Sequence, residues 1–481
     1  MNFGKILLFG ACFAATQSIA QTTVNSASEK IGLQESIETA LKNNISIRQS
    51  QLQVDRGIND VAESKYRRYP TVNGGTNLNA FLGRNINPFT NEIITNAVGS
   101  NGFGIQSRLL LFDGYQTRNN IELTQLTLNA ANSDLQAIKN DISLRVAVAY
   151  INVLTQQDLL EVAQKQIEVT KIQLERSDKL VKAGALPETN LYDIKAQLAN
   201  DELQEVNAQN NVESAKLTLK QLMNISADRN IDPIRIPIPD PSVQAYPLTA
   251  QQIYEIAIGY LPDVQAAETR IKMAQKSIDI AKGLKMPTVS ASAGWNTTTT
   301  TAAERMVASG TIDRRNLGNV DFNGQKIPLI IETPGTLSEK IPYFSQFTGN
   351  MNTNVGVSLQ VPIFNGYNAK FRLAGAQIQH KQTELQADNI KLQIRQSIDQ
   401  AYINMSNAAK RYTSTQNQVR ALEETFRAAE ARLGAGSINT LDYNIAKTNL
   451  DRARANLVLA KYDYVFRTKV LDFYQNKPLS L

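Results

Sequence analysis

The chain has 481 residues and a formal net charge of +6, with basic and acidic side chains interspersed, so its composition gives no nucleic-acid footprint. One histidine, His380, and one cysteine, Cys12, exclude a histidine metal cluster and a disulfide within the chain; His380 alone would have to serve any Ser/His/Asp catalytic site. No window offers the roughly 18 to 20 uninterrupted apolar residues of a membrane-spanning helix, so this chain, if it crosses a bilayer, must do so as a β-barrel.

Residues 1–20 have the pattern of a secretory signal, with Lys5 before an apolar run and a small-residue cleavage site at 18–20. We therefore expect the protein to leave the cytoplasm. Because Cys12 lies inside the apolar run, the mature chain is expected to have no thiol chemistry. Lipidation of Cys12 is the alternative, although residues 9–11 form a poor lipidation motif.

In the first half of the mature chain the hydrophobic period changes in a fixed order. Residues 72–78 and 105–111 have the period-two pattern of strands, the first of them weakly. From Leu128 to Val153 apolar residues recur at helical spacing. A helix from Gly114 to Gly184 would have about 70 residues and be roughly 105 Å long. Such a rod needs neighbours along its entire length.

The second half follows the same order. Residues 289–295 and 355–363 are predicted strands, and the glycine-containing insertion between them, residues 304–344, is predicted to be a long surface loop. Apolar residues at 390–426 recur with a mean step of 3.6, which is typical of a nearly straight helix. Helical spacing resumes at 446–464, in a helix that we expect to return along the first.

These two halves are predicted to be copies of one unit. The Phe-x-Gly-Tyr turn at residues 112–115 recurs at 364–367, and Gly184 recurs as Gly436, both 252 positions later. A proline-rich crossing at 232–241 cannot be helix. After a signal at 1–20 the sequence therefore predicts repeat 1 at 21–225, a linker at 226–247 and repeat 2 at 248–481.

Each predicted strand has one apolar and one polar face, as a barrel wall between lipid and water requires. Two strands per repeat give four per chain, which cannot close a barrel. Open strand edges are not tolerated in hydrocarbon, so copies of the chain must complete one another. The sequence thus predicts a mainly α protein with membrane β structure, built from two structural repeats: a long α-helical barrel continuous with a transmembrane β-barrel.

Glycines mark the far end of each long helix. Gly184, followed by Pro187, and Gly436, preceded by Gly434, are typical of residues that end a helix and allow the chain to reverse. Two helical hairpins per chain are therefore expected, with tips at Gly184 and Ala185 and at Gly436 and Ser437. These tips are candidates for partner docking, because backbone there can approach another protein closely. The alternative is that the glycines only cap helices.

The order of these motifs resembles the TolC-type outer-membrane efflux proteins over nearly the whole mature chain. The resemblance rests on a proline at helix exit, Leu-Phe-Asp-Gly at 111–114, Ile-Phe-Asn-Gly at 363–366, and the Ala-Gly tips. It implies a homotrimer in the outer membrane with a twelve-stranded barrel, four strands from each chain, a large periplasmic part, and tips that join a periplasmic adaptor protein and an inner-membrane pump.

Acidic residues near the tips are candidates for a gate. Three copies around an axis would place each tip residue in a ring, and a ring of carboxylates in a narrow lumen attracts cations. Asp442 is the first candidate, with Tyr443, Glu188 and Asp193 as second choices. The family often has an acid six residues after each tip glycine; here Asp442 fits, whereas Asn190 occupies the equivalent position in the first copy. Alternatively, Asp442 is an ordinary first-turn acid of a helix.

We interpret the chain as the outer-membrane channel of a tripartite efflux or type I secretion system, with outer-membrane lipid around its barrel and no cofactor. A non-conducting, envelope-spanning coiled-coil spacer is the alternative, but it would not need strand pairs at matching places in both halves. No nucleophile–base pair or carboxylate cluster is placed as in an enzyme. The sequence names neither the transported substrate nor the particular pump and adaptor.

Overall fold

The computed structural model of the chain describes residues 29–86, 93–95, 97–235 and 246–477. The predicted signal, including Cys12, and much of the predicted linker lie outside the described residues. The chain divides into two compact units. Of the described residues, the helical unit comprises 29–48, 138–235, 246–257 and 395–477, and the strand unit comprises 49–86, 93–95, 97–137 and 258–394.

Helices account for most of the described chain, and several run from one unit into the other. Two of them, α3 and α8, have 67 residues each, so each is roughly 100 Å long. Both long helices are therefore confirmed. The helices are α1 (Leu33–Asn43), α2 (Ile45–Tyr66), α3 (Gln116–Lys182), α4 (Glu188–Met223), α5 (Ala250–Tyr260), α6 (Pro262–Gly283), α7 (Tyr343–Gly349), α8 (Asn368–Gly434) and α9 (Thr440–Phe473).

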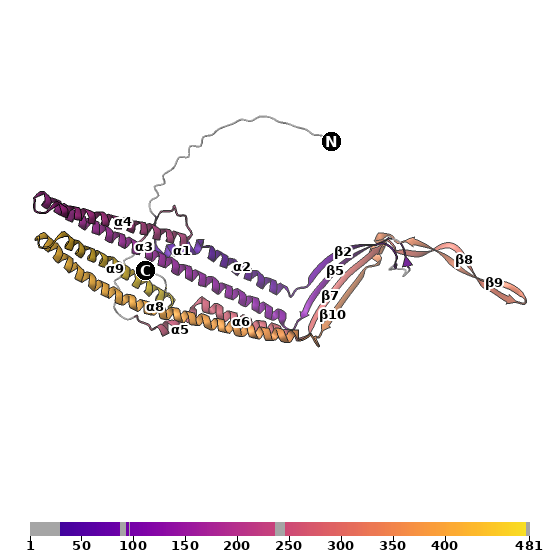
Figure 1. Ribbon diagram of the computed structural model, residues 1–481. Helices are drawn as coiled ribbons and strands as arrows, with labels where there is room; N and C mark the ends of the chain where they lie inside the picture. The colour runs from indigo at the N-terminus through magenta and orange to yellow at the C-terminus, as the bar shows by residue number, and fades with distance from the viewer. Residues whose placement is uncertain (1–28, 87–92, 96, 236–245, 478–481) are drawn as a thin grey trace, which may run out of the picture. The chain divides into compact units, whose positions relative to one another are not determined.

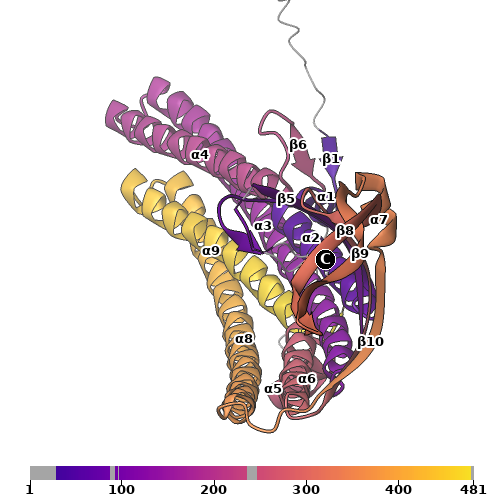
Figure 2. The same cartoon turned by 90° about the vertical axis from the view of Figure 1, so that its right-hand side faces the viewer.

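Within the helical unit, α3 and α4 form one hairpin and α8 and α9 a second (Figures 1 and 2). The apolar stripe predicted on α8 is buried there: Ile398 is 0% exposed, Met405 4% and Val419 7%. Val419 packs with Leu450 and Ala453 of the returning helix. Burial of such a stripe stabilises a helix that has few other tertiary contacts.

A two-stranded parallel sheet joins distant parts of the helical unit. It consists of β1 (Glu29–Ile31) and β6 (Ile231–Pro233), so part of the predicted linker is a strand. Beside it the fully buried Tyr150 hydroxyl of α3 lies 3.1 Å from the carbonyl oxygen of Ile31 and 2.8 Å from that of Ile234. Burial raises the pKa of Tyr150 to about 12.

The strand unit contains an antiparallel four-stranded sheet in the order β10-β7-β5-β2 (Figure 1). All four strands were predicted. The second-half strand before the Phe-x-Gly turn ends at Gln360, earlier than expected, because the following Val361-Pro362 leaves the ladder at a residue without an amide hydrogen. The strands are β2 (Thr71–Phe81), β5 (Val98–Phe112), β7 (Thr288–Thr300) and β10 (Asn352–Gln360).

The register of this sheet places most large apolar side chains on one face, although Asn101, Ser107 and Thr297 share that face and Phe81 and Leu110 lie on the other. Residues directly paired across strands share a face, and each strand alternates faces. One face, here named the apolar face, carries Val72, Leu78, Phe103, Ile105, Leu109, Val289, Trp295, Val355, Val357 and Leu359. The opposite, polar face carries Asn73, Asn77, Gln106, Arg108, Ser290, Ser292, Asn296, Asn354 and Ser358.

Both Phe-x-Gly turns have the same unusual backbone. Gly114 and Tyr115 have φ values of 68° and 65°, and Gly366 and Tyr367 have 61° and 60°. In each turn the phenylalanine and tyrosine rings meet edge to face, with centroids 5.3 Å apart in the first and 5.6 Å in the second. Glycine makes this left-handed conformation accessible, and the chain leaves a strand and enters a long helix there.

The prediction of a surface loop at residues 304–344 was wrong. The segment forms a long antiparallel hairpin of β8 (Glu304–Phe322) and β9 (Gln325–Lys340) (Figure 1), and α7 follows it in the sequence. Its turn is Asn323-Gly324, with φ values of 55° and 80°, the conformation that asparagine and glycine favour in a two-residue hairpin turn. The glycines of this segment favoured the prediction of a loop, whereas its Asn-Gly pair indicates the turn of a β-hairpin.

Two short strands, β3 (Asn85–Ile86) and β4 (Ile93–Ile94), pair in the first strand-to-strand connection.

Ion pairs hold α6 between the two long helices. Arg270 contacts Asp134 of α3 and Lys276 contacts Glu122 of α3, both at 2.6 Å. Glu268 contacts Lys391 of α8 at 2.9 Å. Within the described chain, none of the helices combines the length and apolar character needed to span a membrane.

Candidate functional site

The tips of the two helical hairpins have the same backbone geometry. Gly184 and Gly436 both have φ +71°. At the first tip the amide of Gly184 donates to Val181 and that of Ala185 to Leu180, both at 2.9 Å. At the second, Gly436 and Ser437 repeat the pattern, with donor–acceptor distances of 3.1 Å and 2.9 Å. This is the Schellman motif, in which glycine ends a helix and satisfies its last carbonyl groups.

All four predicted docking residues are exposed in the chain. A Cβ atom added at Gly184 or Gly436 would meet nothing within 4 Å, so only backbone conformation requires glycine there. The helix-capping role is thus visible in the geometry. Whether the tips also bind a partner is a separate question, because capping leaves their outer surfaces uncovered.

The candidate gate residues occupy different environments. Glu188 is the first residue of α4, and both it and Asp193 are exposed. Asp442 lies in the first turn of α9 and is exposed; its amide donates to the side chain of the N-cap residue Asn439 at 2.8 Å. Its carboxylate therefore lies near the positive end of the helix dipole while remaining accessible.

Tyr443 differs from the three acids. Only 2% of it is exposed, and its ring lies 5.4 Å from that of Phe426 on α8. Burial, reinforced by nearby carboxylates, raises the pKa of Tyr443. Of the two neighbours in sequence, Asp442 rather than Tyr443 has the accessibility that a residue facing an opening would need.

A buried charge cluster joins the two hairpins beyond the tips. Lys447 of α9 contacts Asp201 of α4 at 2.9 Å and Asp451, one turn further along α9, at 2.8 Å. The side chains of Lys447 and Asp201 are only 2% and 4% exposed. Asp201 also accepts hydrogen bonds from Thr170 of α3 at 2.5 Å and from Gln197 at 2.7 Å.

This cluster contains one cation and two carboxylates. Burial raises the pKa of Asp451, and Lys447 opposes that rise. Buried ions are costly unless they are paired and hydrogen-bonded, and removing one partner leaves an uncompensated charge. Lys447 therefore fixes the lateral position of α9 against α4 more specifically than apolar packing alone would.

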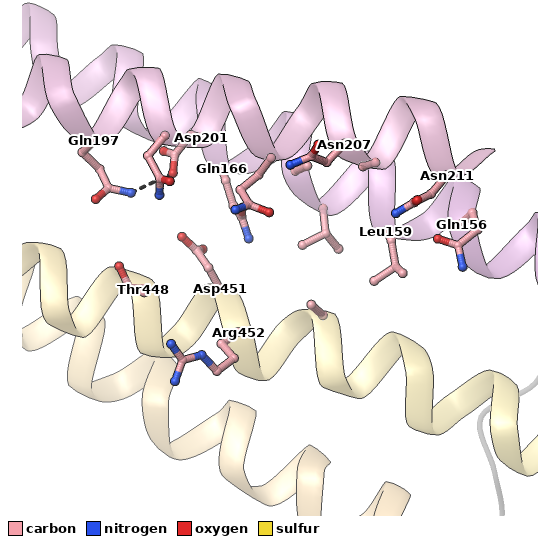
Figure 3. A pocket seen from close by; sticks show the side chains of 16 residues that line it. Gln156, Leu159, Gln166, Gln197, Asp201, Asn207, Asn211, Thr448, Asp451 and Arg452 are labelled. Carbon is pink, nitrogen blue, oxygen red and sulfur yellow. Dashed lines mark hydrogen bonds between the residues drawn. The ribbon is translucent and has the colours of Figure 1, made fainter. Parts of the chain in front are cut away.

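A polar groove of about 380 Å³ runs beside the cluster, between the first hairpin and α9 (Figure 3). Its walls are rich in amide side chains: Gln156, Gln166, Gln197, Asn200, Gln204, Asn207 and Asn211. Figure 3 shows Asp451 on α9 pointing toward the helices that carry Gln166 and Asp201. Further along, the Tyr462 hydroxyl donates to Asp158 of α3 at 2.8 Å, which gives α9 a second polar link to the first hairpin.

Sequence reasoning missed this cluster. Lys447 lies between Tyr443 and Leu450 on the side of α9 that is otherwise buried, and a lysine in an apolar stripe was the available signal. Its partner Asp201 is 246 positions away, so the pairing itself was not readable from periodicity.

A family model described as outer membrane efflux protein matches residues 36–224 and 253–472. The chain belongs to this family. The predicted family is therefore confirmed, and with it the function of an exit duct in the outer membrane and the location there with a large periplasmic part.

Two curated relatives illustrate the similarity. The outer membrane efflux protein BepC of Brucella suis biovar 1 (strain 1330) is 21% identical over 433 residues, which cover 90% of this chain and 82% of BepC. The outer membrane protein TolC of Escherichia coli (strain K12) is 22% identical over 339 residues, which cover 69% of this chain and 60% of TolC.

A solved structure shares the fold. The outer membrane protein VceC of Vibrio cholerae matches with a TM-score of 0.70 at 16% identity, over 92% of this chain and 94% of VceC. The predicted fold class, long helices continuous with membrane strands as in the TolC-type channels, is thus confirmed.

Replacement of Lys447 by methionine should destabilise the helical unit by about 3 to 5 kcal/mol, because Asp201 and Asp451 would remain buried without their cation. Thermal and denaturant unfolding in detergent, followed by circular dichroism, measures the loss. Burial already raises the pKa of Asp451 in the folded state, and removal of Lys447 takes away the charge that opposes this rise, so the loss of stability should shrink as the pH falls.

The matched control is Arg452→Met, which removes an exposed cation from the same helix and should change the unfolding free energy by no more than about 0.5 kcal/mol. Equal stabilities of the two variants would contradict the role assigned to Lys447. Neutralising all three charged residues together should recover part of the lost stability, because no unpaired charge then remains buried.

Proposed function

We propose that three copies of this chain form one continuous duct, which receives substrates from an inner-membrane pump through a periplasmic adaptor protein. The observation that carries this proposal is the four-stranded sheet, which ends in two strands, β2 and β10, each paired on one side only among the residues that the structure describes. Pairing β10 of one copy with β2 of the next would give twelve strands in a trimer and satisfy every edge.

The two faces of the sheet support the same arrangement. Val355, Val357 and Leu359 of the apolar face are between 66% and 80% exposed in the single chain, as lipid-facing residues would be. The opposite face carries asparagine, serine and glutamine, which suit a water-filled interior. A non-conducting spacer, the rival function, would have no use for a polar inner face.

The chain is further proposed to consist of two duplicated repeats, 21–225 and 248–481, joined by the linker 226–247. The matching φ values at the two Phe-x-Gly turns and at the two tips support duplication. Each repeat would then supply one hairpin tip, so that a trimer presents six tips to its partners. Efflux and type I secretion remain alternative uses of the same duct, because the loading pump selects the cargo.

Adaptor docking is proposed at Gly184, Ala185, Gly436 and Ser437. Tryptophan at the glycines would strain a positive φ, so the sharper test places it at the neighbouring exposed positions. Ala185→Trp and Ser437→Trp should leave the trimer and its unfolding temperature unchanged but reduce efflux by about tenfold or more, as expected when bulk is inserted into a packed interface.

Drug accumulation in cells and co-purification of the adaptor measure these effects. The control is Lys182→Trp, which adds the same bulk to the exposed last residue of α3, before the turn, and should reduce efflux less. Full efflux in both tip variants would contradict docking at these residues, and loss of the trimer would show that the tips serve assembly instead.

The gate is proposed to include Asp442, with Glu188 and Asp193 as further acids and Tyr443 as a buried support. Three exposed Asp442 carboxylates around an axis would attract cations. Asp442→Asn should lower cation selectivity and weaken block by multivalent cations applied from the tip side, with little change in stability because the amide of residue 442 still donates to Asn439.

Single-channel recording in planar bilayers measures both properties, and any conductance at all separates a duct from a spacer. Asp193→Asn, which neutralises a second exposed tip acid, provides the comparison. If Asp442→Asn matches the wild type in conductance, selectivity and block, Asp442 is only a helix-end charge and the constriction lies elsewhere.

A further inference from the structure

A short aromatic helix, α7, lies between the β8–β9 hairpin and β10 (Figure 2). Its sequence, Tyr-Phe-Ser-Gln-Phe-Thr-Gly, places three aromatic rings in seven residues. The loop predicted from the sequence, residues 304–344, covers only the first two residues of this helix. In the structure the helix belongs to the end of the sheet at which β7 finishes, the end remote from the Phe-x-Gly turns.

Beyond the end of β10, residues of α7 and its C-cap supply the hydrogen-bond partners for the edge of β7. The ladder between these strands ends at the pair Asn352–Asn296. Beyond it, the side chain of Gln346 accepts from the amide of Thr300 at 2.7 Å and donates to its carbonyl oxygen at 3.0 Å, and Asn350 donates to the carbonyl oxygen of Thr298 at 2.7 Å. Side-chain amides thus replace the missing strand, which keeps the position of α7 fixed.

On its inner side α7 packs on the apolar face. The ring of Phe347 lies 5.5 Å from that of Phe103 and 6.1 Å from that of Trp295, both near edge to face. The Thr297 hydroxyl donates to the carbonyl oxygen of Phe347 at 2.7 Å. Thr297 and Thr299 are accordingly only 1% and 2% exposed.

On its outer side α7 presents aromatic surface that the described residues of the chain leave uncovered. Phe344 is 79% exposed and Tyr343 45% exposed, with their rings edge to face at 5.7 Å. The Tyr343 hydroxyl lies 3.4 Å from the side-chain nitrogen of Asn101. The outer surface of α7 is therefore continuous with the exposed apolar face of the sheet. It places apolar rings and polar groups at the same position along the strands.

We infer that α7 lies in the interfacial zone of the outer membrane's outer leaflet, with Phe344 inserted beside the lipid chains and the Tyr343 hydroxyl at headgroup level. The inference rests on the proposed function, in which the apolar face contacts lipid and the long helices leave from the periplasmic end. Aromatic side chains with a polar end favour this zone, and an apolar helix face lying in the interface plane binds it.

Tryptophan fluorescence gives a direct test, because Trp295 is the only tryptophan. In a Trp295→Phe background, Phe344→Trp reports on α7, and the matched control Phe322→Trp reports on the end of the β8–β9 hairpin, where Phe322 is 66% exposed. Full-length protein is reconstituted in phosphatidylcholine vesicles that carry a nitroxide either near the headgroup or near the end of the acyl chain. Iodide is the aqueous quencher.

Quenching of the Phe344→Trp fluorescence by the nitroxide near the headgroup should be about twofold or more stronger than quenching by the nitroxide near the end of the acyl chain, as for an interfacial residue. Iodide should quench this fluorescence only weakly. The control should show strong iodide quenching and little lipid quenching. Iodide quenching of Phe344→Trp equal to that of the control would overturn the inference, as would shielding from both quenchers, which would indicate a second copy of the chain over α7.

The wild-type protein separates this inference from the proposed function. Lipid quenching of Trp295 itself reports that the apolar face lies in the bilayer. Absence of that quenching would contradict the membrane placement of the sheet, and the inference would fall with it. Quenching of Trp295 together with iodide-accessible Phe344→Trp would refute the placement of α7 alone.

Discussion

The structure depends on one constraint, which is that backbone amides and carbonyls placed in hydrocarbon must be hydrogen-bonded. Within one chain the sheet meets this requirement except along the outer edges of β2 and β10. The side-chain amides of Gln346 and Asn350 serve the same purpose where β7 extends beyond its partner. Oligomerisation in the proposed duct follows from the remaining open edges, and no special interface residue is needed to explain it.

The helices face a different problem, because water surrounds them but each is too long to be stable alone. Periodic apolar stripes bury against neighbouring helices and give the hairpins most of their stability. Apolar stripes specify relative position only loosely, since one turn of sliding preserves much of the contact. The Lys447–Asp201–Asp451 cluster and the Tyr462–Asp158 hydrogen bond supply that specificity, because a displaced α9 would leave buried charges unpaired.

Periodicity made the long helices and the strand pairs predictable, because apolar residues at helical spacing, such as Ile398, Met405 and Val419, form a stripe that has to be buried. Local backbone chemistry likewise predicted reversals at Gly184 and Gly436. The β8–β9 hairpin was missed although its Asn323-Gly324 turn was readable, because glycine content outweighed turn chemistry. The pairing of Lys447 with Asp201 depends on contact between helices far apart in sequence, which no local pattern contains. Whether the tip residues act as predicted depends on partner chains.

Cysteine cross-linking between strand edges tests the proposed trimer most directly. Asn77→Cys in β2 is combined in turn with Asn354→Cys, Gly356→Cys or Ser358→Cys in β10, all on the polar face. Within one chain the two strands are three positions apart in the sheet, about 14 Å, too far for a disulfide. Oxidation in membranes should give a covalent ladder that ends at the trimer for at least one combination, and none for Asn77→Cys alone. Monomer in every combination would contradict a duct closed by β2–β10 pairing.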